Sequence, residues 1–190
     1  MKPVLETDRL VLRQFTEADA PRLLSLDSDP EVMRYIGPFG LPNEPAYLER
    51  IRSYFLPYYE RGPHFGFWVA ELKATGEFLG WFHLRDALDY RFAKEASFLP
   101  GEFDVGYRMI RSAWGKGLAT EMTRTLVARG FARPEVQAIV ACVMAANLAS
   151  CRVLQKSGLK PCAEFILPGF VEPAYKYRIS REDYEAARAI

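Results

Sequence analysis

The chain has 190 residues, of which 49% are hydrophobic and 26% are charged. A chain of this length can bury one substantial core, so we expect a single domain over residues 1–190. With 25 basic and 24 acidic residues the formal net charge is only +1. Such a balance lacks the positive surface that attracts nucleic acid or an anionic membrane, so we expect neither as a partner.

The sequence carries no sign of membrane insertion or export. Its apolar runs are short, and the opening MKPVLETDRL lacks the apolar centre of a secretory signal. We therefore expect a soluble, cytoplasmic protein. The three cysteines, Cys142, Cys151 and Cys162, are odd in number and show no C-x-x-C spacing. They are predicted to be reduced core thiols, and we expect no disulfide and no metal site.

The first half of the chain combines strands with helices. Alternating apolar residues predict a strand within residues 4–15. Thr16 and Asp19 then resemble a helix-opening box, in which the threonine hydroxyl caps an amide and the acid reciprocates. Further helical segments are predicted around residues 30–35 and over residues 45–59. Two antiparallel strands follow at residues 65–72 and 78–84, and residues 85–102 are predicted to form a surface loop.

The second half alternates strands and helices. Strands are predicted at residues 103–110, 136–143 and 159–167, and helices at residues 116–132 and 147–157. This order implies one sheet with helical crossovers. No internal repeat and no change in composition divides the chain into two domains.

A glycine-rich bend joins the strand at residues 103–110 to the following helix. Gly115 and Gly117 allow the backbone to curl, and the first amides of the helix point into that curl, so a diphosphate would fit there. Glycines at such a bend can also serve the turn alone. A dinucleotide fingerprint would need glycine where Thr120 stands, and a nucleoside-triphosphate loop would need serine or threonine at Gly117. Both rivals are disfavoured.

A second segment opens the helix at residues 147–157. Asn147 can cap that helix, Ser150 lies in its first turn, and Gly158 is the expected left-handed stop. As local structure the segment is complete without any further role. A role in binding or catalysis is the alternative.

The two segments together resemble the GNAT N-acetyltransferase superfamily, and within it the RimJ/RimL-like group. The run Trp114-Gly-Lys-Gly-Leu-Ala119 is similar to the family's pyrophosphate signature, with tryptophan at its first position. The opening residues 5–13 and the Asn147-x-x-Ser150 element are further landmarks in the family's order. The resemblance implies an α/β (α+β) fold: a mixed, mostly antiparallel sheet of six to seven strands, splayed at its centre and flanked by helices. It also implies transfer of acetyl from acetyl-CoA to an amine.

The resemblance places coenzyme contacts along the strand end, the bend and the helix start, and in the second segment. These residues are Met109, Ile110, Arg111, Trp114, Gly115, Lys116, Gly117, Leu118, Ala119, Thr120, Asn147 and Ser150. The pantetheine arm of the coenzyme is expected in the split of the sheet.

Three catalytic tasks follow from the chemistry. A backbone amide of Tyr107 or Met109 is the candidate donor to the oxyanion. Leu154 stands where many family members carry the tyrosine that protonates the thiolate. The resemblance to the RimJ/RimL-like group implies that the serine of the Asn-x-x-Ser element can act instead, which makes Ser150 the candidate acid. Asp104, with Glu102 beside it, is the candidate base acting through a water, although a solvated surface charge is the alternative.

The acceptor side is less defined by sequence. His83 is predicted to be a packed histidine rather than a base. The aromatic residues Tyr35, Phe39, Tyr54, Phe67 and Trp81 could line an acceptor pocket or belong to the core. The acceptor amine is expected on a protein N-terminus or a small molecule, and the protein is expected to be a monomer or homodimer. A coenzyme-binding sensor or interaction module without catalysis is the alternative function.

Overall fold

The structure, a computed structural model, describes residues 3–37 and 40–188. The contacts divide the chain into two compact units, one of residues up to 83 with 107–119 and one of residues 84–106 with those from 120 on. Three elements begin in one unit and end in the other: strand β4 (Phe78–Asp86), strand β5 (Glu102–Met109) and helix α5 (Leu118–Phe131).

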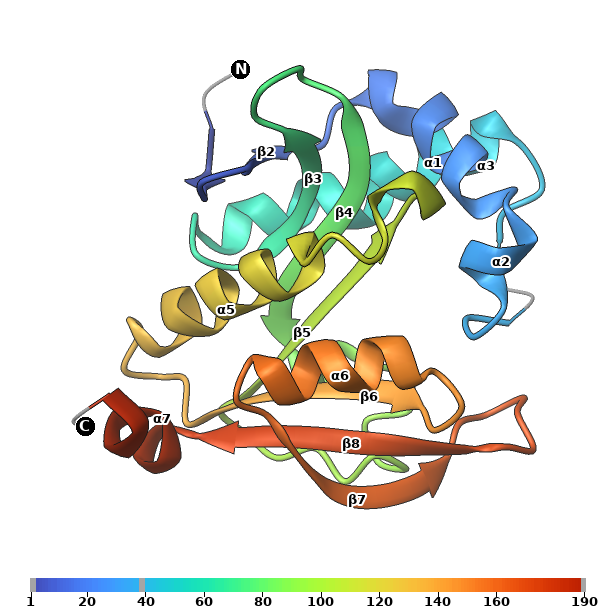
Figure 1. The fold of residues 1–190 in the computed structure, drawn as a ribbon. Coiled ribbons are helices and arrows are strands. Elements are labelled where there is room, and N and C mark those ends of the chain that lie inside the picture. The colour runs from blue at the N-terminus through green and yellow to red at the C-terminus, as the bar shows by residue number, and fades with distance from the viewer. Residues whose placement is uncertain (1–2, 38–39, 189–190) are drawn as a thin grey trace. The chain divides into compact units, whose positions relative to one another are not determined.

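The eight strands follow the order β1-β2-β3-β4-β5-β6-β8-β7 (Figure 1). Strands β5 and β6 are parallel, whereas β1 with β2, β2 with β3, β6 with β8 and β7 with β8 are antiparallel. Helices flank the sheet, so the predicted mixed, mostly antiparallel α/β architecture is confirmed. Within residues 3–37 and 40–188 the sheet has eight strands, more than the six to seven expected.

The first of the additional strands arises at the N-terminus. The segment predicted as one strand is a hairpin of β1 (Leu5–Glu6) and β2 (Leu10–Gln14), in which Leu5 pairs with Leu12. The Thr7 hydroxyl accepts a hydrogen bond from the Leu10 amide at 3.0 Å, which closes the turn between them. β3 (Gly66–Leu72) then pairs with β2.

The helices of the first unit are shorter and more varied than predicted. They comprise a 3-10 turn (Glu17–Asp19), α1 (Ala20–Asp27), α2 (Pro30–Met33), α3 (Glu44–Arg50), a π-helical turn (Ile51–Phe55), α4 (Leu56–Tyr58) and a 3-10 turn (Tyr59–Arg61). The helix predicted over residues 45–59 is thus interrupted by a wider turn. Pro57 supplies a reason, because it cannot donate the amide hydrogen bond that a regular helix needs there.

Aromatic side chains, together with several aliphatic ones, form the core of the first unit. The buried members are Phe15, Ala20, Leu23, Tyr47, Ile51, Phe55, Tyr58, Phe67 and Val69, and Tyr54 and Trp81 pack against them. Phe67 stacks on Phe55 with ring centroids 4.7 Å apart. Phe67 is therefore a core residue. Tyr35 is half-buried, and Phe39, named as a candidate pocket residue, lies outside the described residues.

His83 is packed, as predicted. Its side chain is buried, and its ring lies 5.4 Å from that of Phe67 and 5.7 Å from that of Trp81. These contacts place the histidine inside the aromatic core.

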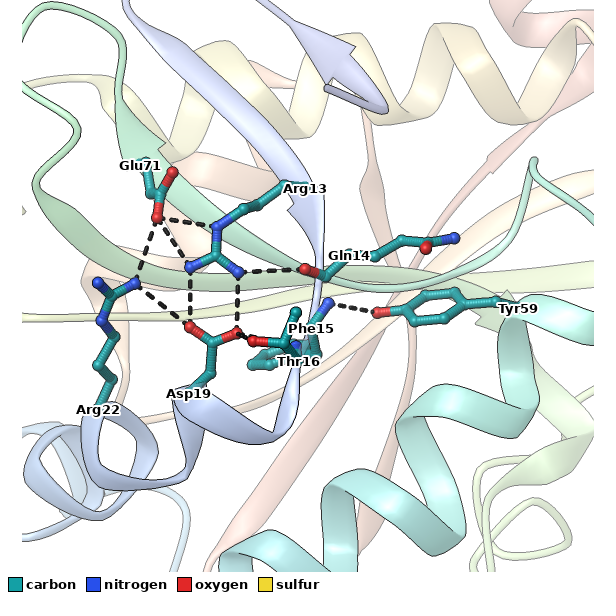
Figure 2. Close-up of polar contacts among 8 residues, drawn as sticks. All are labelled: Arg13, Gln14, Phe15, Thr16, Asp19, Arg22, Tyr59 and Glu71. Atoms are coloured by element: carbon teal, nitrogen blue, oxygen red, sulfur yellow. Dashed lines mark hydrogen bonds and ion pairs between the residues drawn. The ribbon is translucent and has the colours of Figure 1, made fainter. Parts of the chain in front are cut away.

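A buried ion-pair network fixes the turn from β2 into α1 (Figure 2). The guanidinium of Arg13 donates to both carboxylate oxygens of Asp19 at 2.8 Å and to Glu71 at 2.9 Å. Asp19 also accepts from the Thr16 amide at 2.9 Å and from the Thr16 hydroxyl at 3.1 Å. The predicted helix-opening box is confirmed: the Thr16 side chain caps the backbone at Asp19, and the Asp19 carboxylate accepts from the Thr16 amide.

The second unit contains β5, β6 (Ala138–Met144), β8 (Pro173–Ser180) and β7 (Lys160–Ile166), with helices α5, α6 (Leu148–Lys156) and α7 (Arg181–Arg188). The inward residues predicted for α5, Leu118, Met122, Leu126 and Phe131, are all buried. The sequence reading assigned no element to residues 168–190, so β8 and α7 were missed. Alternating charges in β8 conceal it: Lys176 is buried but paired with Glu102 at 2.6 Å.

Two local expectations in the second unit need correction. Residues 85–102 are more than a surface loop, because β4 continues to Asp86 and Ala87, Ala96 and Phe98 pack with Val140 in a small core. The three cysteines are free, but only Cys151 is buried, Cys142 is half-buried and Cys162 is exposed. The prediction of core thiols is therefore wrong for Cys162, which β7 places at an outer position.

Neither a membrane span nor a metal cluster is found within residues 3–37 and 40–188. No helix there is long and apolar enough to cross a bilayer. No group of three or more histidine, cysteine, aspartate or glutamate side chains is placed there to hold an ion.

Candidate active site

The bend between β5 and α5 begins with a short 3-10 turn at Arg111–Ala113. Trp114 follows it and is 47% exposed, yet its indole Nε1 donates to the carbonyl of Met109 at 2.9 Å. The tryptophan at the first signature position thus ties the bend back to the strand that precedes it. This contact gives the unusual residue a structural reason.

The two glycines of the bend adopt left-handed backbone conformations. Gly115 has φ of 72° and Gly117 has φ of 76°, which side chains other than glycine rarely tolerate. A Cβ at Gly115 would meet nothing within 4 Å, so the backbone is open on that side. Among the described residues, no acceptor is found for the amides of residues 115–117. The bend therefore presents main-chain donors next to the positive end of α5.

Arg9 supports the bend from the other side. Its guanidinium donates to the carbonyl of Lys116 at 2.9 Å and lies 3.6 Å from where a Cβ of Gly117 would stand. A cavity of about 320 Å³ lies elsewhere, beside Arg13, and one of about 260 Å³ adjoins the bend. The second is lined by Arg9, Leu72, Glu77, Leu79, Ser112, Ala113, Lys116 and Leu118. Sequence reasoning gave Arg9 no role, although it lies in the opening landmark of residues 5–13.

The end of β5 has one edge paired and one edge turned away from β4. The amide of Ile110 donates to the carbonyl of Leu79 on β4 at 3.0 Å. A Cβ on Gly80 would lie 2.0 Å from the carbonyl oxygen of Arg108, so that carbonyl also points toward β4. Backbone groups alternate in direction along a strand, and the amides of Tyr107 and Met109 therefore point to the opposite edge. These are the two predicted oxyanion donors.

The pairing of β5 with β6 is brief. Parallel register runs from Glu102 opposite Ala138 to Asp104 opposite Val140, while β5 itself continues to Met109. Beyond Asp104, the edge of β5 that faces away from β4 is therefore not paired with β6 among the described residues.

Asp104, the candidate base, is buried rather than solvated. It is 2% exposed and accepts a hydrogen bond from the Tyr90 hydroxyl at 2.9 Å. Arg85 Nε lies 4.0 Å from the same carboxylate, and the Arg85 guanidinium covers the Tyr90 ring at 3.6 Å. Burial raises the pKa of Tyr90 far above its ordinary value, so this phenol stays protonated and acts as a donor.

Glu102 has a structural role. Its carboxylate pairs with Lys176 at 2.6 Å and Arg178 at 3.0 Å, and accepts from the Leu99 amide at 3.1 Å. With these partners it anchors the loop before β5 to β8.

The Asn147 element has the predicted local structure. The Asn147 side chain accepts from the Ser150 amide at 3.1 Å and caps α6, and Gly158 ends that helix with φ of 91°. Ser150 is half-buried in the first turn. Leu154, in the place of the family tyrosine, is 4% exposed and belongs to the core.

The predicted site residues are divided between the two units. Tyr107 and the coenzyme candidates from Met109 to Ala119 belong to the first unit, whereas Asp104, Thr120, Asn147 and Ser150 belong to the second. Within the first unit the structure brings the strand edge and the bend together through the contact of Trp114 with Met109.

Fold and bend together define an α/β protein with an open turn before a helix, whose main-chain donors are suited to phosphate groups. The family described as the acetyltransferase (GNAT) domain matches residues 9–160. The chain belongs to this family and is an N-acetyltransferase.

Curated relatives agree with this assignment. The chain is 30% identical over 189 residues to an FsC-acetyl coenzyme A-N(2)-transacetylase of Aspergillus fumigatus, with 96% of this chain and 78% of the relative covered. It is 33% identical over 163 residues to the uncharacterized N-acetyltransferase YoaA of Bacillus subtilis, with 84% of each covered.

Solved structures show the same fold. The aminoglycoside acetyltransferase AAC(6')-Ib in complex with ribostamycin and coenzyme A has a TM-score of 0.78 at 24% identity, covering 95% of this chain and 98% of that one. RimL, a ribosomal L7/L12 N-acetyltransferase in complex with coenzyme A, has a TM-score of 0.74 at 14% identity, covering 94% and 98%.

Proposed function

We propose that this protein transfers the acetyl group of acetyl-CoA directly to a primary amine on a protein N-terminus or a small molecule. The open bend at residues 115–117 carries the proposal. It offers left-handed glycines, amides with no acceptor in the described part of the chain, and the start of a 14-residue helix. These features suit a diphosphate, and relatives with this fold are seen with coenzyme A.

The remaining coenzyme contacts follow from the strand. The edge of β5 that faces away from β4 would pair with the amides of the pantetheine arm, and Met109 or Tyr107 would donate to the thioester oxygen as it becomes negative. The Met109 carbonyl already accepts from Trp114. This bond helps to fix the backbone of Met109 and with it the direction of its amide, which is the donor proposed for the oxyanion.

Two proton transfers complete the reaction. The attacking amine loses a proton and the departing thiolate of coenzyme A gains one. We assign the second task to the Ser150 hydroxyl, in the absence of the family tyrosine. Asp104 remains the proposed base, and its burial means that a proton must reach it through water. Holding amine and thioester together can itself supply roughly 7–11 kcal/mol of the barrier.

Ser150→Ala should lower kcat about 100-fold, the low end of a general acid's contribution, while the Kd for coenzyme A stays unchanged. Steady-state kinetics and calorimetry measure the two quantities. Ser157→Ala is the matched control: it makes the same change just after α6, where the hydroxyl donates to the Val153 carbonyl at 2.8 Å. An undiminished rate in the Ser150 variant would remove that hydroxyl from the mechanism.

The function itself is tested by acetyl-CoA consumption across peptides, amino acids, polyamines and aminoglycosides. We expect amine-dependent release of the coenzyme thiol and an acetylated amine detected by mass spectrometry. Coenzyme binding without transfer to any amine would instead support the sensor function.

The finer assignments belong to the same proposal. We place the chain in the RimJ/RimL-like group, as a single cytoplasmic domain that is a monomer or homodimer, uses no metal and has no nucleic-acid or membrane partner. Gel filtration and metal analysis of the purified protein test the oligomeric state and the metal content.

A further inference from the structure

A buried arginine on β5 is paired on one side only. In the first unit, Arg108 Nη1 lies 2.5 Å from the Asp27 carboxylate at the end of α1, and the two side chains are 15% and 7% exposed. The Tyr47 hydroxyl donates to the other oxygen of Asp27 at 2.8 Å. Asp27 is thus held by two partners, whereas the Arg108 guanidinium has further donors.

The remaining edge of Arg108 lacks an acceptor. Its Nε is buried and has no hydrogen-bond partner among the described residues, and no bond from Nη2 is found there either. These two nitrogens form the edge of a guanidinium that binds a carboxylate through two parallel hydrogen bonds. A buried donor without a partner costs about 1–3 kcal/mol. An anionic ligand at this edge would remove that cost.

Arg50 adds a second positive charge to the same region. It lies one helical turn after Tyr47 on α3, is exposed, and contacts no carboxylate among the residues that the structure describes. Although the Arg50 side chain is exposed, its guanidinium lies over the Phe55 ring at 5.9 Å. Partial desolvation there and the charge of Arg108 lower the pKa of Arg50. Arg50 thus adds a positive charge near the pair of Arg108 and Asp27.

Strand alternation places Arg108 on the face of β5 opposite its neighbour Tyr107. Arg108 lies over the Trp81 ring at 5.3 Å, whereas Tyr107 contacts Phe82 on the other face of β4. Trp81 packs against the aromatic core of the first unit, so Arg108 lies on the same side of the strand as that core. The acceptor is assigned to this side.

We propose that Arg108 and Arg50 bind a carboxylate on the acceptor, which makes small amines that also carry a carboxylate, such as amino acids, the preferred substrate class. This inference rests on the proposed acetyl transfer and assigns its acceptor. The positive pair would bind the acceptor carboxylate and disfavour polycationic amines.

The test compares amino acids with their uncharged amides, which present the same amine without the carboxylate. Rates are expressed per unprotonated amine. The unaltered protein should show kcat/KM at least about tenfold higher for the carboxylate member of each pair, as expected for one charge-assisted bidentate contact. Arg108→Gln should reduce that preference at least about tenfold, and Arg50→Gln should reduce it by a smaller factor.

Two further variants keep the test sharp. Arg34→Gln, at an exposed arginine that pairs weakly with Glu31 at 3.9 Å, should retain the preference. If loss of Arg108 alone leaves Asp27 uncompensated and the chain unfolds, the double variant Asp27→Asn with Arg108→Gln restores neutrality, and exposed Arg50 remains testable.

Equal use of acid and amide by the unaltered protein, or a preference that survives in both the Arg108 and Arg50 variants, would overturn the inference. If no amine of either set is acetylated, the proposed transfer fails instead. In that case calorimetric titration with the acid and with its amide tests the carboxylate site separately. Stronger binding of the acid, with the difference lost in Arg50→Gln, supports the carboxylate site. Equal binding of acid and amide refutes it.

Discussion

Gly117→Glu is expected to abolish measurable binding of coenzyme A. Gly117 has φ of 76°, so a side chain there strains the backbone that presents the amides of the bend. The glutamate would also place a negative charge beside the donors that we assign to a diphosphate. Isothermal titration calorimetry measures the loss, and thermal unfolding shows whether the variant is folded.

Gly62→Glu is the matched control for this change. Gly62 follows the 3-10 turn Tyr59–Arg61 with φ of 116°, and a Cβ there would meet nothing within 4 Å. It precedes the start of β3, whereas Leu72 at the other end of β3 lines the cavity at the bend. We expect Gly62→Glu to bind coenzyme A like the unaltered protein. Unchanged binding in the Gly117 variant would show that the bend does not hold the diphosphate.

Arg13→Met is expected to lower the free energy of unfolding by about 3–5 kcal/mol, because it removes one partner from a buried ion-pair network. Arg13 is 7% exposed and bonds to both Asp19 and Glu71 (Figure 2). Without the guanidinium, the carboxylate of Asp19 stays buried beside a methionine. Urea unfolding followed by circular dichroism measures the change.

A surface pair offers the comparison. Arg52 and Glu17 lie 2.6 Å apart with both side chains 50% exposed, and Arg52→Met should cost far less stability than Arg13→Met because water screens the exposed pair. Equal losses in the two variants would contradict a special role for burial at Arg13.

The same network predicts a pH dependence. Burial alone would raise the pKa of Asp19, but hydrogen bonds from Arg13 and Thr16 outweigh it and lower the pKa below its ordinary value. A carboxyl group with a lowered folded-state pKa contributes stability above its unfolded pKa of about 3.9, and that stability is lost as the pH falls further. The free energy of unfolding should therefore decline below about pH 4, and less steeply in Arg13→Met.

Local signals predicted much of the fold because they act through nearby residues. The Asn147 cap, the Gly158 stop and the inward face of α5 depend on spacing within one helix, and each is present. β8 was missed for the opposite reason. Its charged Lys176 is buried only because Glu102, distant in sequence, neutralises it, and no local pattern reveals such a partner.

The candidate site likewise combines features that the sequence predicts with features that depend on residues far apart in the chain. The glycines of the bend are visible in sequence because a left-handed backbone requires glycine. The support from Arg9 and the close approach of Gly80 to the Arg108 carbonyl arise from segments far apart in the chain. The environment of Asp104 under Tyr90 was likewise not predictable, because the sequence suggested a solvated loop there.

The central claim is that the bend before α5 binds the diphosphate of coenzyme A. Calorimetric titration of the unaltered protein with coenzyme A and with pantetheine, which lacks the diphosphate, tests it most directly. We predict saturable binding of coenzyme A with a Kd at least about 100-fold lower than that of pantetheine, because charge-assisted bonds to the bend would be lost. Equal affinities for the two ligands would contradict the claim.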